Sequence, residues 1–198
     1  KSCSFYIVFF YKMRSKIIIY GGSSLISKHI FVEFYKDNYE FIVFCRNKEK
    51  TIENIESSKL DQSRFDIHVV KLEELENNLK IIDFFNFKIK GIIWVAGYTG
   101  DPKKEMSNPD LIKKNFNVNL VNPTIIIDSL IPKLEDEGFI SVITSVAGLR
   151  GRSKRIFYCS SKAGMINYLS GLRQSLYKRN ILVNTVIPGY MSTEKFSI

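Results

Sequence analysis

Short runs of apolar, often β-branched residues alternate along this chain with longer segments in which apolar residues recur at helical spacing. The runs are apolar at nearly every position, as expected of strands that helices cover on both faces. This alternation is typical of an α/β protein with a parallel sheet. Six runs are predicted strands, at residues 16–20, 41–44, 67–70, 91–96, 139–144 and 181–187.

The segments between these strands are long enough for crossover helices, and right-handed crossovers restrict the order in which the strands pair. The expected fold is therefore a Rossmann-type, doubly wound parallel sheet with the strand order 3-2-1-4-5-6. Five helices are predicted between the strands, at residues 24–37, 47–59, 72–86, 109–137 and 158–179.

Residues 13–198 are predicted to form a single domain, because no internal repeat, low-complexity tract or Pro/Ser-rich linker interrupts them. Residues 1–12 are expected to be an N-terminal extension outside the fold. They hold an aromatic run that is too short to span a membrane and lacks a signal-peptide cleavage site, and Met13 stands just before the first predicted strand. A surface-anchoring tail is the alternative interpretation.

Composition supports one globular domain. Of the 198 residues, 45% are hydrophobic and 25% are charged, which excludes a disordered or collagen-like chain. Lysine and arginine outnumber aspartate and glutamate by 29 to 20, giving a net charge of +9. Because the basic residues are spread along the whole chain, the excess does not indicate a nucleic-acid surface, and we expect no nucleic-acid partner.

The cysteines and histidines give no metal or disulfide signal. Cys3, Cys45 and Cys159 lie far apart without a CxxC pair, and His29 and His68 have no partner at metal-ligand spacing. We therefore expect no metal and a reducing, cytoplasmic location.

The segment after the first predicted strand, Tyr20 to Ser27, contains a glycine turn that leads into a helix. Glycine allows backbone N–H groups to approach a pyrophosphate at the positive end of that helix. Leu25 and Ser27 stand where a dinucleotide fingerprint has its later glycines, so a plain strand-to-helix turn is the alternative interpretation. The candidate dinucleotide contacts are Gly21, Ser23, Ser24, Leu25 and Ile26.

A second candidate site includes a predicted helix near the C-terminus. Tyr158 and Lys162 are four residues apart on one helical face, where the ammonium can favour the phenolate. Ser145 follows an apolar strand upstream of this pair, and the last predicted strand runs into Pro188 and Gly189. A tyrosine and a lysine at this spacing are common in a lysine-rich chain, so the order of the surrounding motifs carries the specificity.

With these motifs in this order, residues 16–196 resemble the short-chain dehydrogenase/reductase family. The likeness rests on the glycine turn, on the segments 117–120 and 145–148, on the tyrosine–lysine pair and on Pro-Gly followed by Thr193. It implies an oxidoreductase that transfers a hydride from NAD(P)H to a carbonyl. It also implies catalytic roles for Ser145, Tyr158, Lys162 and Asn119, and cofactor contacts at Ala96, Gly97, Tyr158, Lys162, Pro188, Gly189, Met191 and Thr193.

The family resemblance assigns a role to each catalytic residue. Tyr158 would be the general acid that protonates the carbonyl oxygen, and Ser145 would hydrogen-bond the same oxygen. Lys162 would support the phenolate and hold the nicotinamide ribose, and Asn119 would hold a water of the proton relay. Since a tyrosine ordinarily titrates near 10, lowering its pKa by about 3 units takes about 4 kcal/mol of phenolate stabilisation.

The choice of cofactor is expected at the end of the second predicted strand, where the chain has Cys45, Arg46 and Asn47. In the family, an arginine here accommodates the 2′-phosphate, so Arg46, assisted by Asn47, favours NADP. An arginine stacked on the adenine of NAD is the alternative. Lys71 occupies a position at which family members often have an aspartate that contacts adenine.

The segments 94–101 and 146–162 are similar to one subgroup of the family, which reduces the 2-keto sugar of decaprenylphosphoryl pentofuranose in cell-envelope polysaccharide synthesis. In the first segment the family's two asparagines are replaced by Trp94 and Val95. The second segment holds four cations before the tyrosine, of which Arg150 and Arg152 are the candidate contacts to a substrate phosphate. A solvated basic loop is the alternative. A lipid-linked substrate would place the protein at the inner face of a membrane.

Two other functions stay open: a general ketone or 3-oxoacyl reductase with the same machinery, and an inactive dinucleotide-binding regulator. The resemblance also implies a homo-oligomer, dimer or tetramer, whose seam would involve the helices around 119–134 and 166–176. Family members continue past the Pro-Gly motif through a substrate-covering helix and a seventh strand. We expect both of these to be absent here, leaving a truncated domain.

Overall fold

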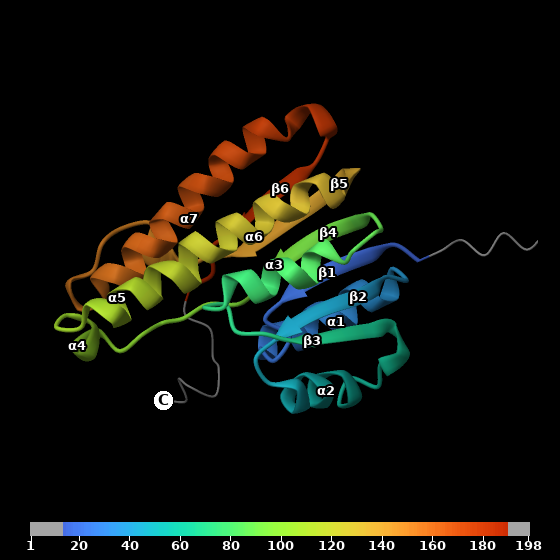
Figure 1. Cartoon of the computed structure of the whole chain (residues 1–198), viewed down its shortest axis with the longest axis horizontal. Coiled ribbons are helices and arrows are strands. Elements are labelled where there is room, and N and C mark those ends of the chain that lie inside the picture. Colours follow the sequence, from blue (N-terminus) through green and yellow to red (C-terminus); the bar gives the residue numbers. More distant parts are fainter. Residues whose placement is uncertain (1–13, 190–198) are drawn as a thin grey trace, which may run out of the picture.

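The computed structural model describes residues 14–189, which form a single sheet flanked by helices (Figure 1). All neighbouring strands pair in parallel, and their order is β3-β2-β1-β4-β5-β6. This confirms the predicted Rossmann-type topology. The strands are β1 (Lys16–Tyr20), β2 (Glu40–Cys45), β3 (Phe65–Val69), β4 (Ile89–Trp94), β5 (Leu134–Ile143) and β6 (Leu182–Val186).

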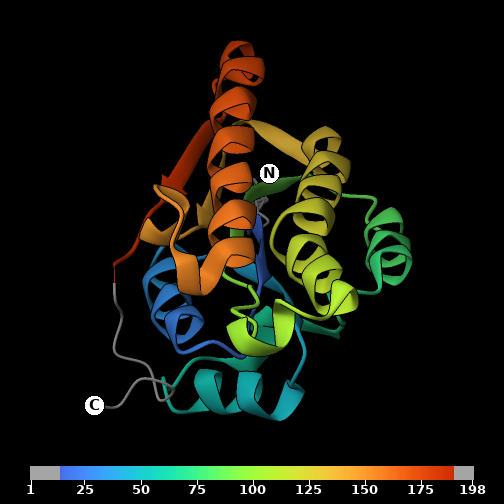
Figure 2. The ribbon, with the colours of Figure 1, turned by 90° about the vertical axis from the view of Figure 1, so that its left-hand side faces the viewer.

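Helices cover both faces of the sheet (Figure 2). Apolar residues of α3, α6 and α7 pack with one face of the sheet, and those of α1 and α2 pack with the other. A π-helix, Asn117–Val121, joins α5 to α6. The helices are α1 (Leu25–Lys36), α2 (Lys48–Glu56), α3 (Leu75–Asp83), α4 (Pro102–Glu105), α5 (Pro109–Phe116), α6 (Asn122–Leu130) and α7 (Ile156–Ser175).

Strand β1 shows why the strands are apolar throughout. Successive side chains of a strand point to opposite faces, so Ile18 and Tyr20 enter the core beneath α3, α6 and α7, while Ile17 and Ile19 enter the core beneath α1 and α2. All four side chains are buried. Complete burial of an aliphatic side chain of this size contributes about 1.5–3 kcal/mol, which favours a strand in the middle of the sheet.

The helix predicted at 109–137 is wrong only at its end, residues 134–137. The helical segment ends at Lys133, and strand β5 begins at Leu134. Pro132 lacks the N–H that a continuing helix needs, and Leu134 is buried and pairs with Ile89 of β4. Glu137 then adopts a left-handed conformation with φ of 58°. Tertiary pairing with β4 therefore overrides the helical spacing of the apolar residues.

Two further findings concern the molecule as a whole. None of the helices within residues 14–189 is long and apolar enough to cross a membrane. Within the same range, no cluster of three or more His, Cys, Asp or Glu side chains is arranged to hold a metal ion. The predicted extension at 1–12 lies outside the described residues, as do the candidate contacts Met191 and Thr193.

Candidate active site

A cavity of about 560 Å³ opens at the carboxyl ends of the central strands. It lies where the chain leaves β1 towards one face of the sheet and leaves β4 towards the other, the usual position for a ligand in a doubly wound sheet. Most of the predicted cofactor residues line this cavity. They are Gly21, Ser23, Ser24, Leu25, Arg46, Asn47, Ala96 and Gly97.

The predicted glycine turn forms one wall of the cavity. Gly21 has φ of +104°, and a Cβ atom on it would lie 2.8 Å from the backbone nitrogen of Ala96. Only glycine both adopts this conformation readily and lets the Ala96 backbone come this close. Ser24 caps α1, its Oγ accepting the N–H of Ile26 at 3.3 Å, and the Ser27 hydroxyl donates to the Gly21 carbonyl at 2.8 Å. Ser27, at a position where the fingerprint has a glycine, thus links the helix to the turn. Ser24, at the N-terminus of α1, lines the cavity, and an anion can bind at this end of the helix.

The floor of the cavity includes a stack of aromatic rings that the sequence analysis did not predict. Parallel register places Tyr20 between Phe44 and Trp94, and its ring lies 4.3 Å and 4.2 Å from theirs. The Tyr20 hydroxyl is buried and has no hydrogen-bond partner in the part of the chain that is described, and burial raises the pKa of this phenol well above its usual value. The apolar stack closes the cavity against the core.

Cations and one carboxylate line the end of the cavity near β2 and β3. Arg46 and Lys50 both reach the cavity, and Asn47 caps α2 by accepting the N–H of Lys50 at 2.7 Å. The cap uses the Asn47 oxygen and not its NH₂ group, and the assignment of Arg46 and Asn47 to a 2′-phosphate stays a prediction. The carboxylate is Glu73. Lys50 and Glu73 lie several residues after the ends of β2 and β3, and no motif in the sequence indicates that they reach the cavity.

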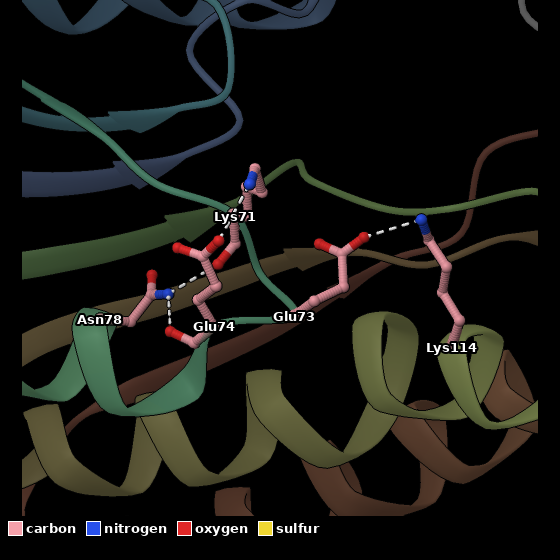
Figure 3. A network of polar contacts seen from close by, with 5 residues as sticks. All are labelled: Lys71, Glu73, Glu74, Asn78 and Lys114. Atoms are coloured by element: carbon pink, nitrogen blue, oxygen red, sulfur yellow. Dashed lines mark hydrogen bonds and ion pairs between the residues drawn. The ribbon is translucent and has the colours of Figure 1, made fainter. Parts of the chain in front are cut away.

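Glu73 is held by an ion pair with Lys114, at 2.9 Å (Figure 3). Partial burial pushes the pKa of Glu73 upward, but the hydrogen bond and charge of Lys114, with the charge of Arg46, outweigh it and lower the pKa below its usual value. The Lys114 ammonium also lies over the ring of Tyr98, 5.1 Å from its centroid. Lys71, by contrast, does not line the cavity and pairs with Glu74 at 3.0 Å.

Ser145, Tyr158 and Lys162 come together beside the cavity. Ser145 follows strand β5, and its side chain lies close enough to Tyr158, on the first turn of α7, to lower the pKa of that phenol. One turn further along α7, Lys162 places its ammonium 5.9 Å from the centre of the Tyr158 ring. Lys162 Nζ also lies 3.5 Å from where a Cβ on Gly97 would be, so glycine leaves room for it at the edge of the cavity. The spacing of these residues in the sequence thus produces the expected cluster.

The electrostatics of this cluster depend on burial. Burial raises the pKa of Tyr158, and the Ser145 hydrogen bond and the Arg155 charge only partly oppose it. Burial also lowers the pKa of Lys162 to about 8. The phenol is therefore protonated at neutral pH in this structure. The lysine ammonium lies over the ring and hydrogen-bonds the Ile143 carbonyl at 3.3 Å. The net effect on Tyr158 is a pKa raised by burial, not the lowered pKa that the sequence suggests.

Asn119 lies in the π-helix, and its side chain is committed to the protein. Its Oδ1 accepts the N–H of Tyr98 at 2.8 Å, and its Nδ2 donates to the Tyr98 carbonyl at 2.7 Å and to Asn115 at 2.9 Å. Both amide hydrogens are thus used. These contacts clamp the Tyr98 backbone, and the role of Asn119 in holding a water of the proton relay stays a prediction.

The remaining candidates lie around the loop between β5 and α7. The N–H of Val146 donates to the Pro188 carbonyl at 3.1 Å, so Pro188 lies beside the catalytic serine. Arg152 is half-buried, and its Nε–H is buried without a hydrogen-bond partner among residues 14–189. Arg150 is exposed. Neither Pro188, Gly189 nor Ile26 lines the cavity itself.

Comparison with known proteins agrees with this geometry. The family model described as short chain dehydrogenase matches residues 15–197. The 3-oxoacyl-[acyl-carrier-protein] reductase of Bos taurus is 22% identical over 178 residues, covering 89% of this chain and 75% of that protein. The corresponding reductase of Aggregatibacter actinomycetemcomitans is 28% identical over 196 residues, covering 92% and 78%. Carbonyl reductase family member 4 of Xenopus laevis is 26% identical over 195 residues, covering 93% and 79%.

Solved structures show the same fold. BdcA in complex with NADPH superimposes with a TM-score of 0.79 at 20% identity, over 91% of this chain and 72% of that one. Actinorhodin polyketide ketoreductase with NADPH gives a TM-score of 0.79 at 18% identity, over 92% and 72%. Together with the family match along nearly the whole chain, the serine–tyrosine–lysine cluster beside a dinucleotide-sized cavity leads to one conclusion: the chain belongs to the short-chain dehydrogenase/reductase family of NAD(P)-dependent oxidoreductases.

Proposed function

We propose that this protein reduces a carbonyl group with NADPH, with Tyr158 as the acid. The observation that carries the proposal is the assembly of Ser145, Tyr158 and Lys162 at the edge of the cavity. A protonated phenol, a hydrogen-bonding hydroxyl and a buried ammonium are the groups that a carbonyl needs as negative charge develops on its oxygen.

The residues of the cavity fit a dinucleotide phosphate. The Gly21 turn and the N-terminus of α1 suit a pyrophosphate, and Arg46 with Lys50 suits the 2′-phosphate that distinguishes NADP from NAD. The similar folds of BdcA and actinorhodin ketoreductase hold NADPH. When bound, NADPH supplies the hydride.

The side chains of the protein then transfer the proton to the carbonyl oxygen. In this proposal the Ser145 hydroxyl, which lies near Tyr158, donates a hydrogen bond to the carbonyl oxygen of the substrate. Tyr158 donates its proton to that oxygen as the carbonyl becomes an alcohol. Lys162, buried and with its pKa near 8, stabilises the phenolate that remains until a proton from solvent replaces the one transferred.

We further propose that the substrate carries a phosphate. Arg152 lies in the loop between Ser145 and Tyr158, its Nε–H is buried without a partner among residues 14–189, and a buried guanidinium donor needs an acceptor. The first candidate is the keto group of a lipid-phosphate-linked sugar, as the segment 146–162 suggests, which would require the protein to work at a membrane surface. The second candidate is a 3-oxoacyl group on an acyl-carrier protein, the substrate class named in several relatives.

Steady-state NADPH consumption tests these proposals with keto-sugar phosphates, their unphosphorylated counterparts and acetoacetyl-coenzyme A. In Arg152→Glu, the KM for phosphorylated substrates should rise about tenfold or more, as expected from loss of a charge-assisted hydrogen bond, while the KM of unphosphorylated ones should stay unchanged. Lys80→Glu, an exposed charge reversal on α3, is the control. Equal effects on both substrate classes would remove the phosphate proposal, and no NADPH consumption with any carbonyl would contradict the reductase proposal.

A further inference from the structure

A buried carboxylate behind the active site has no part in the mechanism above. Glu105, the last residue of α4, is 2% exposed, and its Oε1 accepts a hydrogen bond from Asn115 Nδ2 at 2.9 Å. The backbone turns tightly around it, since a Cβ on Gly100 would lie 1.8 Å from the same oxygen. Burying a carboxylate costs several kcal/mol of solvation. We propose that Glu105 is a positioning residue for the active site, acting through Asn115; this inference rests on the proposed reductase function.

The carboxylate sets the orientation of Asn115, which is completely buried. An ionised carboxylate only accepts hydrogen bonds, so the amide must turn its NH₂ group towards Glu105 and its oxygen away. That oxygen accepts hydrogen bonds from Asn119 Nδ2 at 2.9 Å and from Ser161 Oγ at 3.0 Å. A reversed Asn115 amide would turn its NH₂ group towards the NH₂ group of Asn119, so two donors would face each other. Glu105 therefore fixes the direction of the whole network.

The two branches of the network end at opposite walls of the reaction site. Through Asn119, one branch clamps the N–H and carbonyl of Tyr98, and it brings Gly97 to the edge of the cavity. Through Ser161, the other branch holds α7 one residue before Lys162, and the Ser161 hydroxyl also reaches the Tyr158 carbonyl at 3.0 Å. Asn115 thus ties the end of β4 to the helix that carries the acid and the lysine.

Gly97, Asn119 and Lys162 are packed closely at the edge of the cavity. The position of a Cβ on Gly97 lies 3.3 Å from Asn119 Oδ1 and 3.5 Å from Lys162 Nζ, so the three residues converge. A displacement of about 1 Å between catalytic groups can lower a rate by about a hundredfold. Loss of the Glu105 acceptor would free the Asn115 amide to reverse, and the two walls would then no longer be held at one separation.

The test compares Glu105→Gln with Glu105→Leu. Glutamine still offers an oxygen to Asn115 Nδ2, so Glu105→Gln should keep kcat within about threefold of wild type, whereas Glu105→Leu should lower kcat by about tenfold to a hundredfold. The Kd for NADPH should change by less than about threefold in both, because the adenine end of the cavity is untouched. Ile82→Ala, a buried cavity-forming change on α3, controls for lost stability alone.

A second readout is independent of turnover. Amide hydrogen exchange at Tyr98 in the cofactor-free protein reports whether the N–H still donates to Asn119. Exchange should accelerate in Glu105→Leu, but not in Glu105→Gln or Ile82→Ala. If Glu105→Leu fails to fold, Glu105→Asp, which withdraws the carboxylate by one methylene, should show an intermediate acceleration.

Unchanged exchange at Tyr98, or equal kcat losses in Glu105→Leu and Ile82→Ala, would overturn the proposal. So would a Gln variant as impaired as the Leu variant. Should wild type reduce no carbonyl at all, the proposed function fails but the exchange experiment still decides the positioning role of Glu105.

Discussion

At the scale of single residues, the proton donor is the decisive group. Tyr158 is protonated at neutral pH, and burial raises its pKa further, while the nearby Ser145 side chain opposes that shift. A protonated phenol can give a proton to a carbonyl oxygen. This is the role that we propose for Tyr158.

Tyr158→Phe removes that proton and leaves the ring in place. We expect kcat for carbonyl reduction to fall by about 10²- to 10⁴-fold, the usual worth of a general acid, with the Kd for NADPH within about threefold of wild type. Steady-state kinetics and NADPH fluorescence titration measure the two values. Tyr177→Phe, at an exposed position after α7, is the matched control. Retention of wild-type kcat in Tyr158→Phe would exclude the phenol as the acid.

At the scale of elements, the turn from β1 into α1 shapes the cavity. It contains Gly21, whose left-handed backbone lies against Ala96. Ser24 caps α1, and Ser27 stands where other dinucleotide turns have a glycine. The hydroxyl of Ser27 fills its position with a hydrogen bond to the turn, so the imperfect fingerprint still gives a complete structure. An incomplete glycine motif is thus no sign of an inactive protein here.

Gly21→Val tests this element. The valine side chain would collide with the Ala96 backbone, and its φ of +104° is strongly unfavourable for a β-branched residue. We expect the Kd for NADPH, measured by fluorescence titration, to rise at least about a hundredfold. Gly171→Ala, on α7 where nothing lies near the added Cβ, should leave that Kd unchanged and slightly stabilise the helix. Tight NADPH binding by Gly21→Val would show that the turn does not hold the cofactor.

At the scale of the whole molecule, the fold buries the ammonium of Lys162 on α7. The Lys162 side chain is 5% exposed, and its pKa of about 8 in the fold lies below the ordinary value of 10.5. The unfolded chain therefore binds more protons than the folded one between these two values. Below about pH 8 the folded state holds the desolvated charge of Lys162 and is destabilised by it. As the pH rises towards 10, Lys162 loses its proton in the folded state and this destabilisation disappears.

Lys162→Met removes the titrating group and hence this pH dependence. Between pH 8 and pH 10, the unfolding free energy of wild type should rise relative to that of Lys162→Met, by at most about 3 kcal/mol, since one pKa unit corresponds to about 1.4 kcal/mol. Urea unfolding at several pH values measures the difference. Parallel pH profiles for the two proteins would mean that Lys162 is not desolvated in the fold.

Other features of the whole molecule stay predictions. Val121 and Ile125, on the segment predicted to join two copies, are 40% and 39% exposed, as an unpaired seam requires. Cys45 and Cys159 are free and buried, and the reducing location stays a prediction.

The sequence by itself determined the order of strands and the meeting of Ser145, Tyr158 and Lys162. Apolar runs, crossover handedness and the spacing of residues on one helix are local properties, and a parallel sheet brings strand ends to one edge. Only the tertiary structure decided what surrounds these groups. In the fold, strand β5 begins at Leu134, where a longer helix is expected, and the Asn119 amide hydrogen-bonds the Tyr98 backbone. Glu105 is buried against Asn115. These outcomes depend on burial and on partners far apart along the chain, and no local pattern encodes either.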